Sequence, residues 1–531
     1  MDRAVFERWL IQRTNRRRFL AGLAAAPLAM SRRGQPTRPR QDAAAVSAGT
    51  DPFSLGVASG DPLPDGVVLW TRLAPDPLNG GGMPPEPVEV RWEIASDEGF
   101  TRVLRSGVTT ARPELAHSVH VDATGLEPGR IYFYRFAARG MVSPAGRTRT
   151  APAPGGALDR LRLGVASCAH WEHGYFTAYR HLAAEDLDAV LFLGDYLYEY
   201  PPGQGFVIAG QDPIRLHTPG ELITLKQYRN RYAQYRTDPD LQATHAAFPW
   251  IATWDDHEVA NNYAGVHSER GDSPAVFLAR RAAAYQAYYE HMPLRPESLP
   301  QGPEMRIYRR ITFGNLAEIS VLDTRQYRSA QPCGDTVAPR CAAALDPALT
   351  LTGPEQERWL LDGLASASAQ WKVIAQQVMM AELAVRVLGP EPQYNDDQWD
   401  GYPLARNRIL GFLQQAGISD TIVLSGDVHS AWVSDVKADF FDADSPTVAT
   451  EFVATSITAH NPFGSRLAVL LPGNPHIRFF DIRHGYTRCT ITPRRWQADF
   501  RAVPDVTMPD APVETIASFA VEAGQPGAQP V

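Results

Sequence analysis

The chain has 531 residues, of which 44% are hydrophobic and 21% charged, a composition typical of globular proteins. Its 51 basic and 59 acidic side chains give a formal net charge of −8, which excludes a general electrostatic attraction to nucleic acid or to anionic membranes. The length suggests about two to four domains, and any anionic substrate would need a local binding site.

Residues 1–50 have the pattern of an export signal followed by a linker. Arg16, Arg17 and Arg18 precede Phe19 and an Ala-rich stretch that is too short to span a bilayer. Paired arginines at this place resemble a twin-arginine signal; a Sec signal or a basic disordered tail is the alternative. We predict export by the twin-arginine machinery to the periplasm, cell wall or extracellular space, with no transmembrane segment in the mature chain.

Residues 51–150 contain short alternating or aromatic-rich runs separated by Gly- and Pro-containing turns, such as "VEVRWEIA" and "IYFYRFAARG". This spacing predicts a small antiparallel β-sandwich domain. The run "LEPGRIYFYRF" resembles a strand-turn-strand corner of fibronectin type III-like modules. The stretch "APAPGGALD" that follows indicates a linker.

From residue 151 to residue 531, apolar strand-like runs alternate with helical patterns, which predicts an α/β domain. The runs lie at residues 161–168, 188–195, 248–258, 317–328, 371–378 and 420–432. Two alternating runs near the C-terminus, within "IRFFDIRHGYTRCTITPRRWQADF", indicate closing strands of a second sheet. Ligands of such sheets gather outside the carboxyl ends of the strands.

Polar or ionisable side chains stand at the end of each run. They are Cys168; Asp195 and Tyr198; Asp255, Asp256 and His257; Asp323 and Arg325; Gln376 and Gln377; Asp427 and His429. Each has an ordinary explanation by itself, since Asp often caps a helix and Cys is often a small core residue. Clustered carboxylates without a cation would repel one another and raise their own pKa values, so together they predict a metal centre.

The order of these motifs resembles a known superfamily. "GDYLY", "WDDHE" and "GDVH" are similar to the GD, GNH and GH-x-H motifs of calcineurin-like metallophosphoesterases. With the leader, the N-terminal "GVASGDPLPDGVVLWTRL" and the later "LDTRQYR", nearly the whole chain resembles the PhoD family of alkaline phosphatases and phosphodiesterases, relatives of the purple acid phosphatases. The resemblance implies an αββα metallophosphoesterase sandwich behind a small fibronectin type III-like β-sandwich.

The same resemblance implies a site for ferric iron. Asp195 would be a bridging carboxylate and Tyr198 a tyrosinate on Fe³⁺, while Cys168 and His429 would complete the iron ligands. The reference pKa of a tyrosine is about 10, so a phenolate near neutral pH requires a strongly acidic cation. Tyr196 and Tyr200 are expected to be packing or rim residues.

A second cation would share Asp195 and bind Asp256 and Asp427, with Asp255 as a further candidate. Two of these carboxylates stand where the superfamily motifs have Asn and His. Hard oxygen ligands favour Ca²⁺ over Zn²⁺, although the identity of this metal stays open. Gln377 lies near the position of a histidine ligand in related enzymes, and its role also stays open.

The predicted reaction is hydrolysis of phosphate mono- or diesters. Two cations would lower the pKa of a bound water, and the resulting hydroxide would attack in line. His257 would contact the phosphate or protonate the leaving group. Arg325 would clamp a phosphate oxygen with Asp323 orienting it, unless Arg325 is a strand-end residue salt-bridged within the fold.

Two other functions fit the same residues. A phospholipase D-like diesterase would act on phospholipids, and an exported metal- or phosphate-binding protein would dock on the cell wall without catalysis. His257 beside the candidate ligands argues for an enzyme, because a structural metal site would not require it. No basic groove with interleaved aromatic residues indicates dedicated nucleic-acid binding.

Two sequence segments have open structural roles. Cys333 and Cys341 flank a short loop, so oxidation in an exported protein would join them; two free thiols are the alternative. The segment "YNDDQWDGYP" at residues 394–403 is compatible with a rim that faces substrate or with packing beneath an active-site loop.

Overall fold

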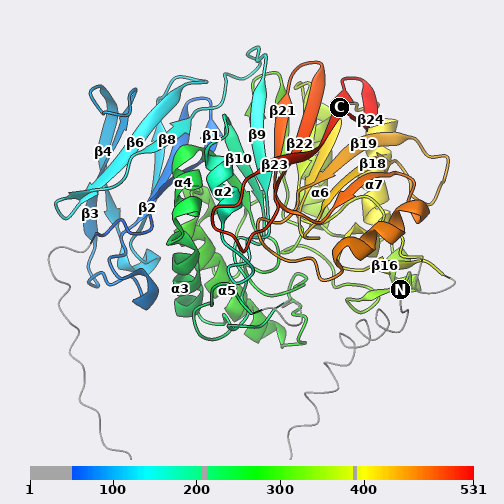
Figure 1. Cartoon of the computed structure of the whole chain (residues 1–531), viewed down its shortest axis with the longest axis horizontal. Coiled ribbons are helices and arrows are strands. Elements are labelled where there is room, and N and C mark those ends of the chain that lie inside the picture. The colour runs from blue at the N-terminus through cyan, green and yellow to red at the C-terminus, as the bar shows by residue number, and fades with distance from the viewer. Residues whose placement is uncertain (1–50, 206–211, 387–390) are drawn as a thin grey trace, which may run out of the picture.

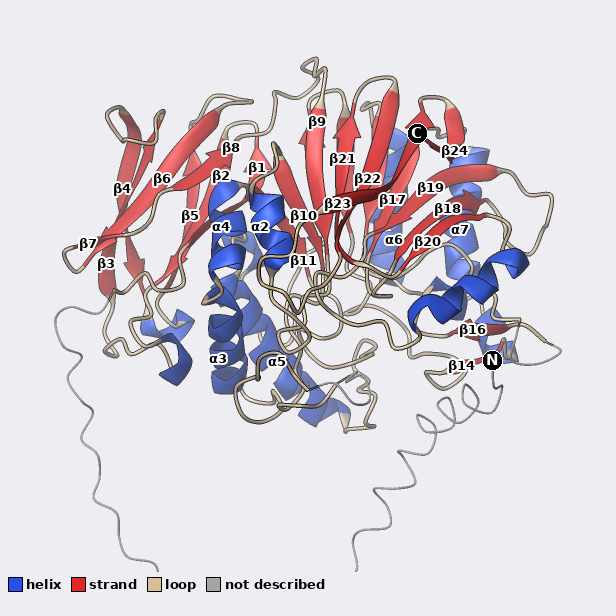
Figure 2. Ribbon diagram, in the orientation of Figure 1, coloured by secondary structure: helices blue, strands red, loops and turns tan. Residues whose placement is uncertain are grey.

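The computed structural model describes residues 51–205, 212–386 and 391–531, so the predicted export signal lies outside the described residues. Two large β-sheets pack face to face, and helices cover the outer side of each (Figures 1 and 2). This arrangement confirms the predicted αββα sandwich. Within the described ranges, no helix is long and apolar enough to cross a membrane.

The first sheet has ten strands and the second has seven. In spatial order the first contains β24 (Gln525–Pro530), β23 (Glu514–Glu522), β22 (Arg495–Val503), β21 (His484–Ile491), β9 (Leu161–Ala166), β10 (Ala189–Leu193), β11 (Pro249–Thr253), β1 (Val57–Leu63), β2 (Gly66–Arg72) and β5 (Ser118–Thr124). The second contains β12 (Arg309–Phe313), β13 (Ala317–Val321), β15 (Trp371–Ala375), β17 (Thr421–Ser425), β19 (Thr447–Val453), β18 (Ala431–Lys437) and β20 (Ile477–Asp481).

Strand β10 shows how its sequence builds three layers. Successive side chains of a strand point to opposite faces of the sheet. Val190 and Phe192 pack in the core under the outer helices, whereas Leu191 and Leu193 pack in the core between the two sheets. Because both faces are covered, the run is continuously apolar rather than alternating with polar residues.

Helices on the first sheet are α2 (Thr177–Ala183), α3 (Leu225–Arg236), α4 (Pro239–Ala247) and α5 (Pro274–His291). Helices α6 (Gly353–Ser366) and α7 (Pro403–Gln415) cover the second sheet. Their apolar faces supply Leu360, Ile409 and Leu410 to a core that also contains Ile374 and Val423. These six helices and the two sheets thus form one stack with three apolar layers.

The N-terminal strands form the predicted β-sandwich, but they do not form a separate sheet system. A third sheet contains β4 (Val103–Ala111), β3 (Val88–Ala95), β6 (Ile131–Ala138) and β7 (Met141–Val142), with β8 (Gly146–Arg149) also paired to β6. It packs against β1, β2 and β5, which belong to the ten-stranded sheet. The predicted division at residue 150 therefore does not separate two independent sets of strands.

Parallel pairing of β1 with β11 joins the two regions. Ser59 is opposite Pro249, and Gly60 is opposite Trp250. A Cβ atom on Gly60 would lie 2.3 Å from the Pro293 carbonyl oxygen, so only glycine allows this approach. Alternation in the sequence predicts a strand here but does not indicate a partner so far along the chain.

Polar side chains fill the joint between β2 and α5, and we call Arg72, Arg229, Glu290 and His291 the joint cluster. The Arg72 guanidinium donates a hydrogen bond from Nη1 to Nε2 of His291, with the nitrogens 2.7 Å apart. Nδ1 of His291 in turn donates to the Ala287 carbonyl oxygen at 2.7 Å. Arg229 forms a two-pronged ion pair with Glu290 through distances of 2.5 and 2.6 Å.

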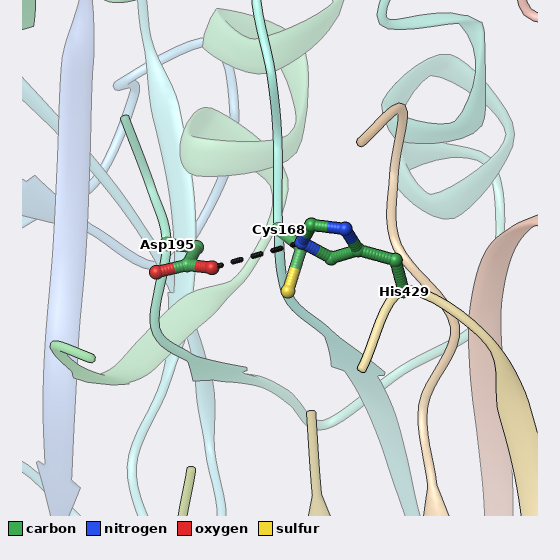
Figure 3. Close-up of side chains that lie close together, drawn as sticks. All are labelled: Cys168, Asp195 and His429. Atoms are coloured by element: carbon green, nitrogen blue, oxygen red, sulfur yellow. Dashed lines mark ion pairs between the residues drawn. The ribbon is translucent and has the colours of Figure 1, made fainter. Parts of the chain in front are cut away.

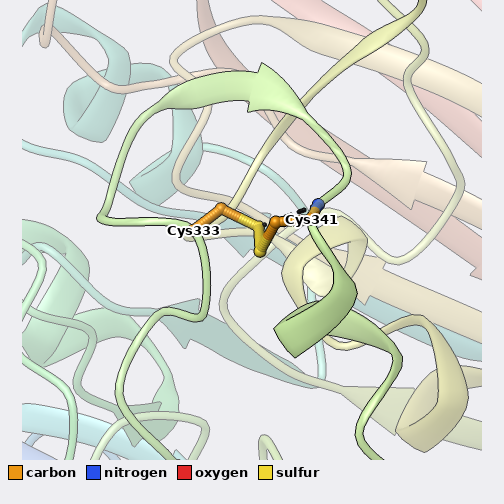
Figure 4. Close-up of a disulfide and its surroundings, with 2 residues drawn as sticks. All are labelled: Cys333 and Cys341. Atoms are coloured by element: carbon orange, nitrogen blue, oxygen red, sulfur yellow. Dashed lines mark hydrogen bonds between the residues drawn. A yellow bond between two sulfur atoms is a disulfide. The ribbon is translucent and has the colours of Figure 1, made fainter.

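Cys333 and Cys341 form a disulfide, which confirms the predicted local bridge (Figure 4). The closed loop contains the short strand β14 (Val337–Pro339), which pairs with β16 (Gln393–Asn395). Cys168 and Cys489 are free and buried.

Candidate active site

The candidate ligands lie just beyond the carboxyl ends of four strands. Cys168 follows β9, Asp195 follows β10, Asp255 follows β11, and Asp427 follows β17 of the other sheet. Gly194 has a φ of 104°, and a Cβ there would lie 2.5 Å from the backbone nitrogen of Asp255. This glycine lets the ends of β10 and β11 approach closely enough for their carboxylates to share one site.

Four of these residues have left-handed backbone conformations that are unfavourable for side chains other than glycine. The φ angles are 60° at Cys168, 57° at Asp195, 64° at Asp427 and 51° at His429. Each such residue costs about 1 kcal/mol or more. Backbone strain of this kind is retained at functional sites. Here it directs the four side chains toward the same site.

Cys168, Asp195 and His429 form one half of the site, which we call the thiol half together with Tyr198. The candidate ligand atoms of the first three lie within 4.8 Å of one another (Figure 3). The Tyr198 oxygen lies 3.1 Å from Oδ2 of Asp195 and 3.0 Å from Nε2 of His429. One phenol thus lies between the carboxylate and the imidazole.

Burial makes the protons of the thiol half hard to remove. It raises the pKa of Tyr198 well above its usual value, and the charge of Asp195 raises it further. The pKa of the Cys168 thiol rises for the same two reasons. Only a bound cation would make the phenolate and the thiolate favourable at neutral pH, so these residues fit a strongly acidic metal ion.

His429 has the tautomer that a metal ligand needs. Its Nδ1 lies 3.0 Å from the His460 carbonyl oxygen, which can only accept a hydrogen bond, so Nδ1 carries the proton. Burial lowers the pKa of His429 to about 4, which keeps the ring neutral. The lone pair on Nε2 is therefore directed at Tyr198 and Asp195.

Asp195, Asp255, Asp256 and Asp427 form the other half, which we call the carboxylate half; their ligand atoms again lie within 4.8 Å of one another. Among the described side chains, Oδ2 of Asp255 and Oδ1 of Asp256 are buried without a hydrogen-bond partner. Such orphaned carboxylate oxygens are expensive unless a cation binds them. The donor set is entirely oxygen, which suits a hard divalent cation.

The pKa values of the carboxylate half show the same unpaired charge. Burial raises the pKa of Asp427 to about 7, although Arg325 opposes the shift. Burial and the neighbouring carboxylates also raise the pKa values of Asp195 and Asp255 well above their usual range. One buried guanidinium does not balance these acids.

His257 lies between the two halves and is held by a carboxylate. Its Nδ1 is 2.8 Å from Oε2 of Glu199, whose other oxygen accepts the backbone N–H of Asn261 at 2.9 Å. Burial would lower the pKa of His257, but Asp256 and Glu199 outweigh it and raise the pKa well above the usual value. The imidazole is thus kept charged beside the carboxylate half, where it can donate a proton.

Comparison with known proteins identifies the family. A model described as PhoD-like phosphatase matches residues 163–500, and one described as PhoD-like phosphatase, N-terminal domain, matches residues 39–152. The chain belongs to the PhoD-like phosphatase family. It is 51% identical over 491 residues to alkaline phosphatase D of Bacillus subtilis (strain 168), which covers 92% of this chain and 84% of that protein.

A solved structure described as the structure of PhoD has the same fold. It matches with a TM-score of 0.88 and 51% identity, over 91% of this chain and 92% of that one. These matches confirm the predicted family and enzyme class: the chain is a PhoD-like alkaline phosphatase, a phosphoester hydrolase. They favour an enzyme over the binding-protein alternative.

The structure gives Arg325 and Asp323 other partners than the expected clamp. Arg325 is fully buried, forms an ion pair with Asp255 and lies 2.8 Å from Asp397. Asp323 accepts the backbone N–H groups of Arg325 and Gln326 at 3.0 and 2.9 Å. In this PhoD-like phosphatase, Asp323 therefore orders the turn after β13, and it contacts the backbone of Arg325 rather than its guanidinium.

Gln377 is a structural residue in this arrangement. Its Oε1 accepts hydrogen bonds from the backbone and side chain of Thr324, and its Nε2 donates to Thr253 and to the Leu322 carbonyl oxygen. Both ends of the amide are occupied by strand-end groups of the two sheets. The neighbouring Gln376 likewise bonds Ser425 and Val378.

Sequence reasoning missed three residues next to the site. Glu199 follows Tyr198 directly in "GDYLYE", and an acid one position beyond a candidate ligand was a usable signal. Asp397 and Gln398 lie in the segment 394–403, which follows no strand of the large sheets. A search for polar residues at the ends of apolar strands therefore does not find them. Tyr196 and Tyr200, by contrast, have partners outside the ligand groups, namely His245 and Asn261.

Proposed function

We propose that this phosphatase hydrolyses phosphate mono- and diesters with a ferric ion in the thiol half and a calcium ion in the carboxylate half. The observation that carries the proposal is the contrast between the halves: a buried thiol, phenol and imidazole converge on one point, and unpaired carboxylate oxygens converge on the next. Soft and phenolic ligands suit a redox-active transition metal, and hard oxygens suit Ca²⁺. Asp195 belongs to both groups and would bridge them.

Bound cations would supply charge for the phosphoryl oxygens and lower the pKa of a water molecule. The side chains supply the remaining steps. Glu199 holds Nδ1 of His257, and the raised pKa of the imidazole lets it donate a proton to a phosphoryl or leaving-group oxygen. Arg325 offsets part of the carboxylate charge, since it lies 3.7 and 3.5 Å from Asp256 and Asp427.

We also propose that the enzyme is exported through the twin-arginine pathway. The support is the run of Arg16 to Arg18 before a short apolar stretch. Fusing residues 1–50 to a reporter that folds in the cytoplasm tests this proposal. Export that is lost on changing Arg16 and Arg17 to Lys is expected, and export that survives the change contradicts it.

The first test of the metal assignment is elemental analysis of protein purified without added metals or chelators. Iron near one equivalent with calcium is expected. Zinc alone would contradict the iron assignment while leaving a phosphoesterase.

A second test concerns His257. For His257→Ala we expect kcat to fall about 100-fold on p-nitrophenyl phosphate and on its bis-ester. His267→Ala, which changes an exposed histidine, is the matched control and should keep full activity. Unchanged turnover of His257→Ala would show that this residue takes no part in the chemistry.

The ratio of the wild-type rates on p-nitrophenyl phosphate and on its bis-ester separates a monoesterase from a diesterase. Phosphatidylcholine as a third substrate tests the phospholipase alternative.

A further inference from the structure

Residues 393–398, which we call the strap, lead from β16 to the carboxylate half. The strap begins as a strand paired with β14, where Val337 is opposite Asn395. It ends at Asp397 and Gln398, which are 3% and 6% exposed. Neither residue belongs to a candidate ligand group, yet each contacts one of the charged side chains there.

Asp397 binds three cationic or amide groups through one oxygen. Its Oδ1 lies 2.8 Å from Nη1 of Arg325, 2.8 Å from Nη1 of Arg328 and 2.9 Å from Nε2 of Gln331. Burial opposes ionisation of this carboxyl group, but the two arginines outweigh it and lower its pKa. Asp397 is therefore a fixed negative charge on the side of Arg325 that Asp255 does not cover.

Gln398 fixes the second carboxylate contact. Its Nε2 donates to Oδ2 of Asp427 at 2.6 Å, while its Oε1 accepts the backbone N–H of Met379 at 2.7 Å. The amide is thereby locked in one orientation. Oδ1 of Asp427 is left 3.5 Å from Nη2 of Arg325. Asp427 is one of the four acids of the carboxylate half.

We propose that Asp397 and Gln398 are positioning residues that set the cation affinity of the carboxylate half, and that the Cys333–Cys341 loop holds them there. The inference rests on the proposed second cation. Arg325 is a permanent positive charge beside the ligands, and Asp397 offsets that charge. Without Asp397, the guanidinium would compete with a divalent cation for Asp255 and Asp427.

The disulfide loop is tied to both sides of this arrangement. Oδ1 of Asp335 accepts a hydrogen bond from Nδ2 of Asn262 at 2.7 Å, and the backbone N–H of Asn262 donates to Oδ2 of Asp256 at 2.6 Å. The Thr336 carbonyl oxygen accepts the backbone N–H of Asp396 at 3.2 Å. The loop thus contacts the strap on one side and the turn that holds Asp256 on the other.

The test is calorimetric titration of full-length, EGTA-treated protein with Ca²⁺. For Asp397→Asn we expect binding about tenfold weaker, which is the usual scale for a residue that supports metal ligands. Asp499→Asn is the matched control: it makes the same chemical change at a buried carboxyl group that pairs with Arg488, outside the strap and the disulfide loop. Its affinity should stay within about twofold. Gln398→Leu, which removes the hydrogen bond to Oδ2 of Asp427, should also weaken binding.

Cys333→Ala/Cys341→Ala tests the loop. Ca²⁺ binding about threefold weaker is expected, together with faster amide hydrogen exchange at residues 393–398. Melting temperatures of all variants, measured in EGTA, separate unfolding from a change in affinity. A merely structural role of the strap would change melting temperature and leave the affinity of the folded protein unchanged.

Four results would contradict the inference. Asp397→Asn with wild-type Ca²⁺ affinity would show that Asp397 has no positioning role, and an equal loss in Asp499→Asn would show that the effect is one of general charge. Unchanged Ca²⁺ binding and unchanged hydrogen exchange in the disulfide variant would show that the loop does not hold the strap in place. If the wild-type protein binds no Ca²⁺, the proposed second cation is wrong, and the positioning role is wrong with it. If the protein binds Ca²⁺ as expected but hydrolyses no phosphoester, the proposed function is wrong and the positioning role is unaffected.

Discussion

The candidate active site and the joint cluster are both buried and both contain arginine, but they differ in how completely their charged groups are paired. In the joint cluster, Arg229 faces Glu290 through two short bonds and Arg72 faces a neutral His291, and no buried polar atom of these side chains lacks a partner. In the centre, buried oxygens of Asp255 and Asp256 have none. Charged groups that are all paired hold neighbouring elements together, whereas buried carboxylate oxygens without a partner can bind a cation.

The largest expected effect is loss of the phenol in the thiol half. Tyr198→Phe should lower kcat/KM by more than about 100-fold, because it removes a candidate ligand between Asp195 and His429. Steady-state kinetics measures this effect. Tyr196→Phe is the matched control, because its hydroxyl contacts His245 instead. It should cost about 1 kcal/mol of stability and little activity. Equal activity in both variants would place Tyr198 outside the reaction.

Acid should weaken the joint cluster through His291. Arg72 can only donate, so Nε2 of His291 must be unprotonated, and burial lowers the pKa of His291 well below its usual value. The unfolded state binds this proton first as pH falls below about 6.5, so stability is lost in that direction. We expect the free energy of unfolding to fall by about 2 kcal/mol from pH 8 to pH 5 through this residue.

Urea unfolding of His291→Gln at the two pH values measures that contribution. The variant cannot gain the charge, so its pH dependence should be smaller than that of the wild type by this amount. His267→Gln, in an exposed position, should retain the wild-type slope. Identical slopes for wild type and His291→Gln would show that the joint is not the acid-sensitive element.

A smaller effect on catalysis is expected at Glu199. Glu199→Gln should lower kcat about tenfold with little change in KM, because His257 would lose the carboxylate that holds its Nδ1. Glu451→Gln is the control for altering a buried acid, since Glu451 accepts the backbone N–H groups of Met380 and Ala381. It should lower stability and leave kcat unchanged. A parallel rise in KM for Glu199→Gln would contradict a role in the chemical step.

The smallest expected effect is a gain in stability when one carboxylate of the candidate site is neutralised. In EGTA, Asp427→Asn should raise the free energy of unfolding by about 1 kcal/mol, because it removes one of several clustered carboxylates while Gln398 keeps an oxygen to bind. Asp499→Asn should instead lower it by about 1 kcal/mol, because Asp499 is paired with Arg488 at 2.9 Å. Chemical unfolding measures both. Destabilisation by Asp427→Asn would mean that the centre is balanced like the joint.

The layered fold and the convergence of strand ends could be predicted because both depend on local pattern. Apolar runs locate β9, β10, β11 and β17. Because β9, β10 and β11 are parallel neighbours in one sheet, the residues just beyond them share one edge, and Asp427 after β17 of the second sheet lies close to them. The pairing of β1 with β11 could not be predicted, since alternation carries no information about a distant partner. The sequence therefore predicts the N-terminal β-sandwich, but it does not predict that β1, β2 and β5 continue the ten-stranded sheet.

Within the site, the position of a residue at a strand end predicted that it lies near the site, but its residue type did not predict its contacts. Arg325 was identified from its place at a strand end, but its burial among Asp255 and Asp397 gives it partners inside the fold. Asp397 itself lies on an irregular segment that reaches the centre only because β16 pairs with the disulfide loop. Contacts of this kind depend on tertiary packing, which periodicity in the sequence does not report.

The parallel pair of β1 and β11 also orders events during synthesis. The ribosome makes residues 57–63 early, but their partner strand at residues 249–253 emerges much later. Until then β1 has an open edge, and contacts so distant in sequence form slowly. Nascent chains that stall before residue 249 should therefore stay incompletely folded and prone to associate through this edge, so the N-terminal strands complete their fold only after the chain that follows them has been made.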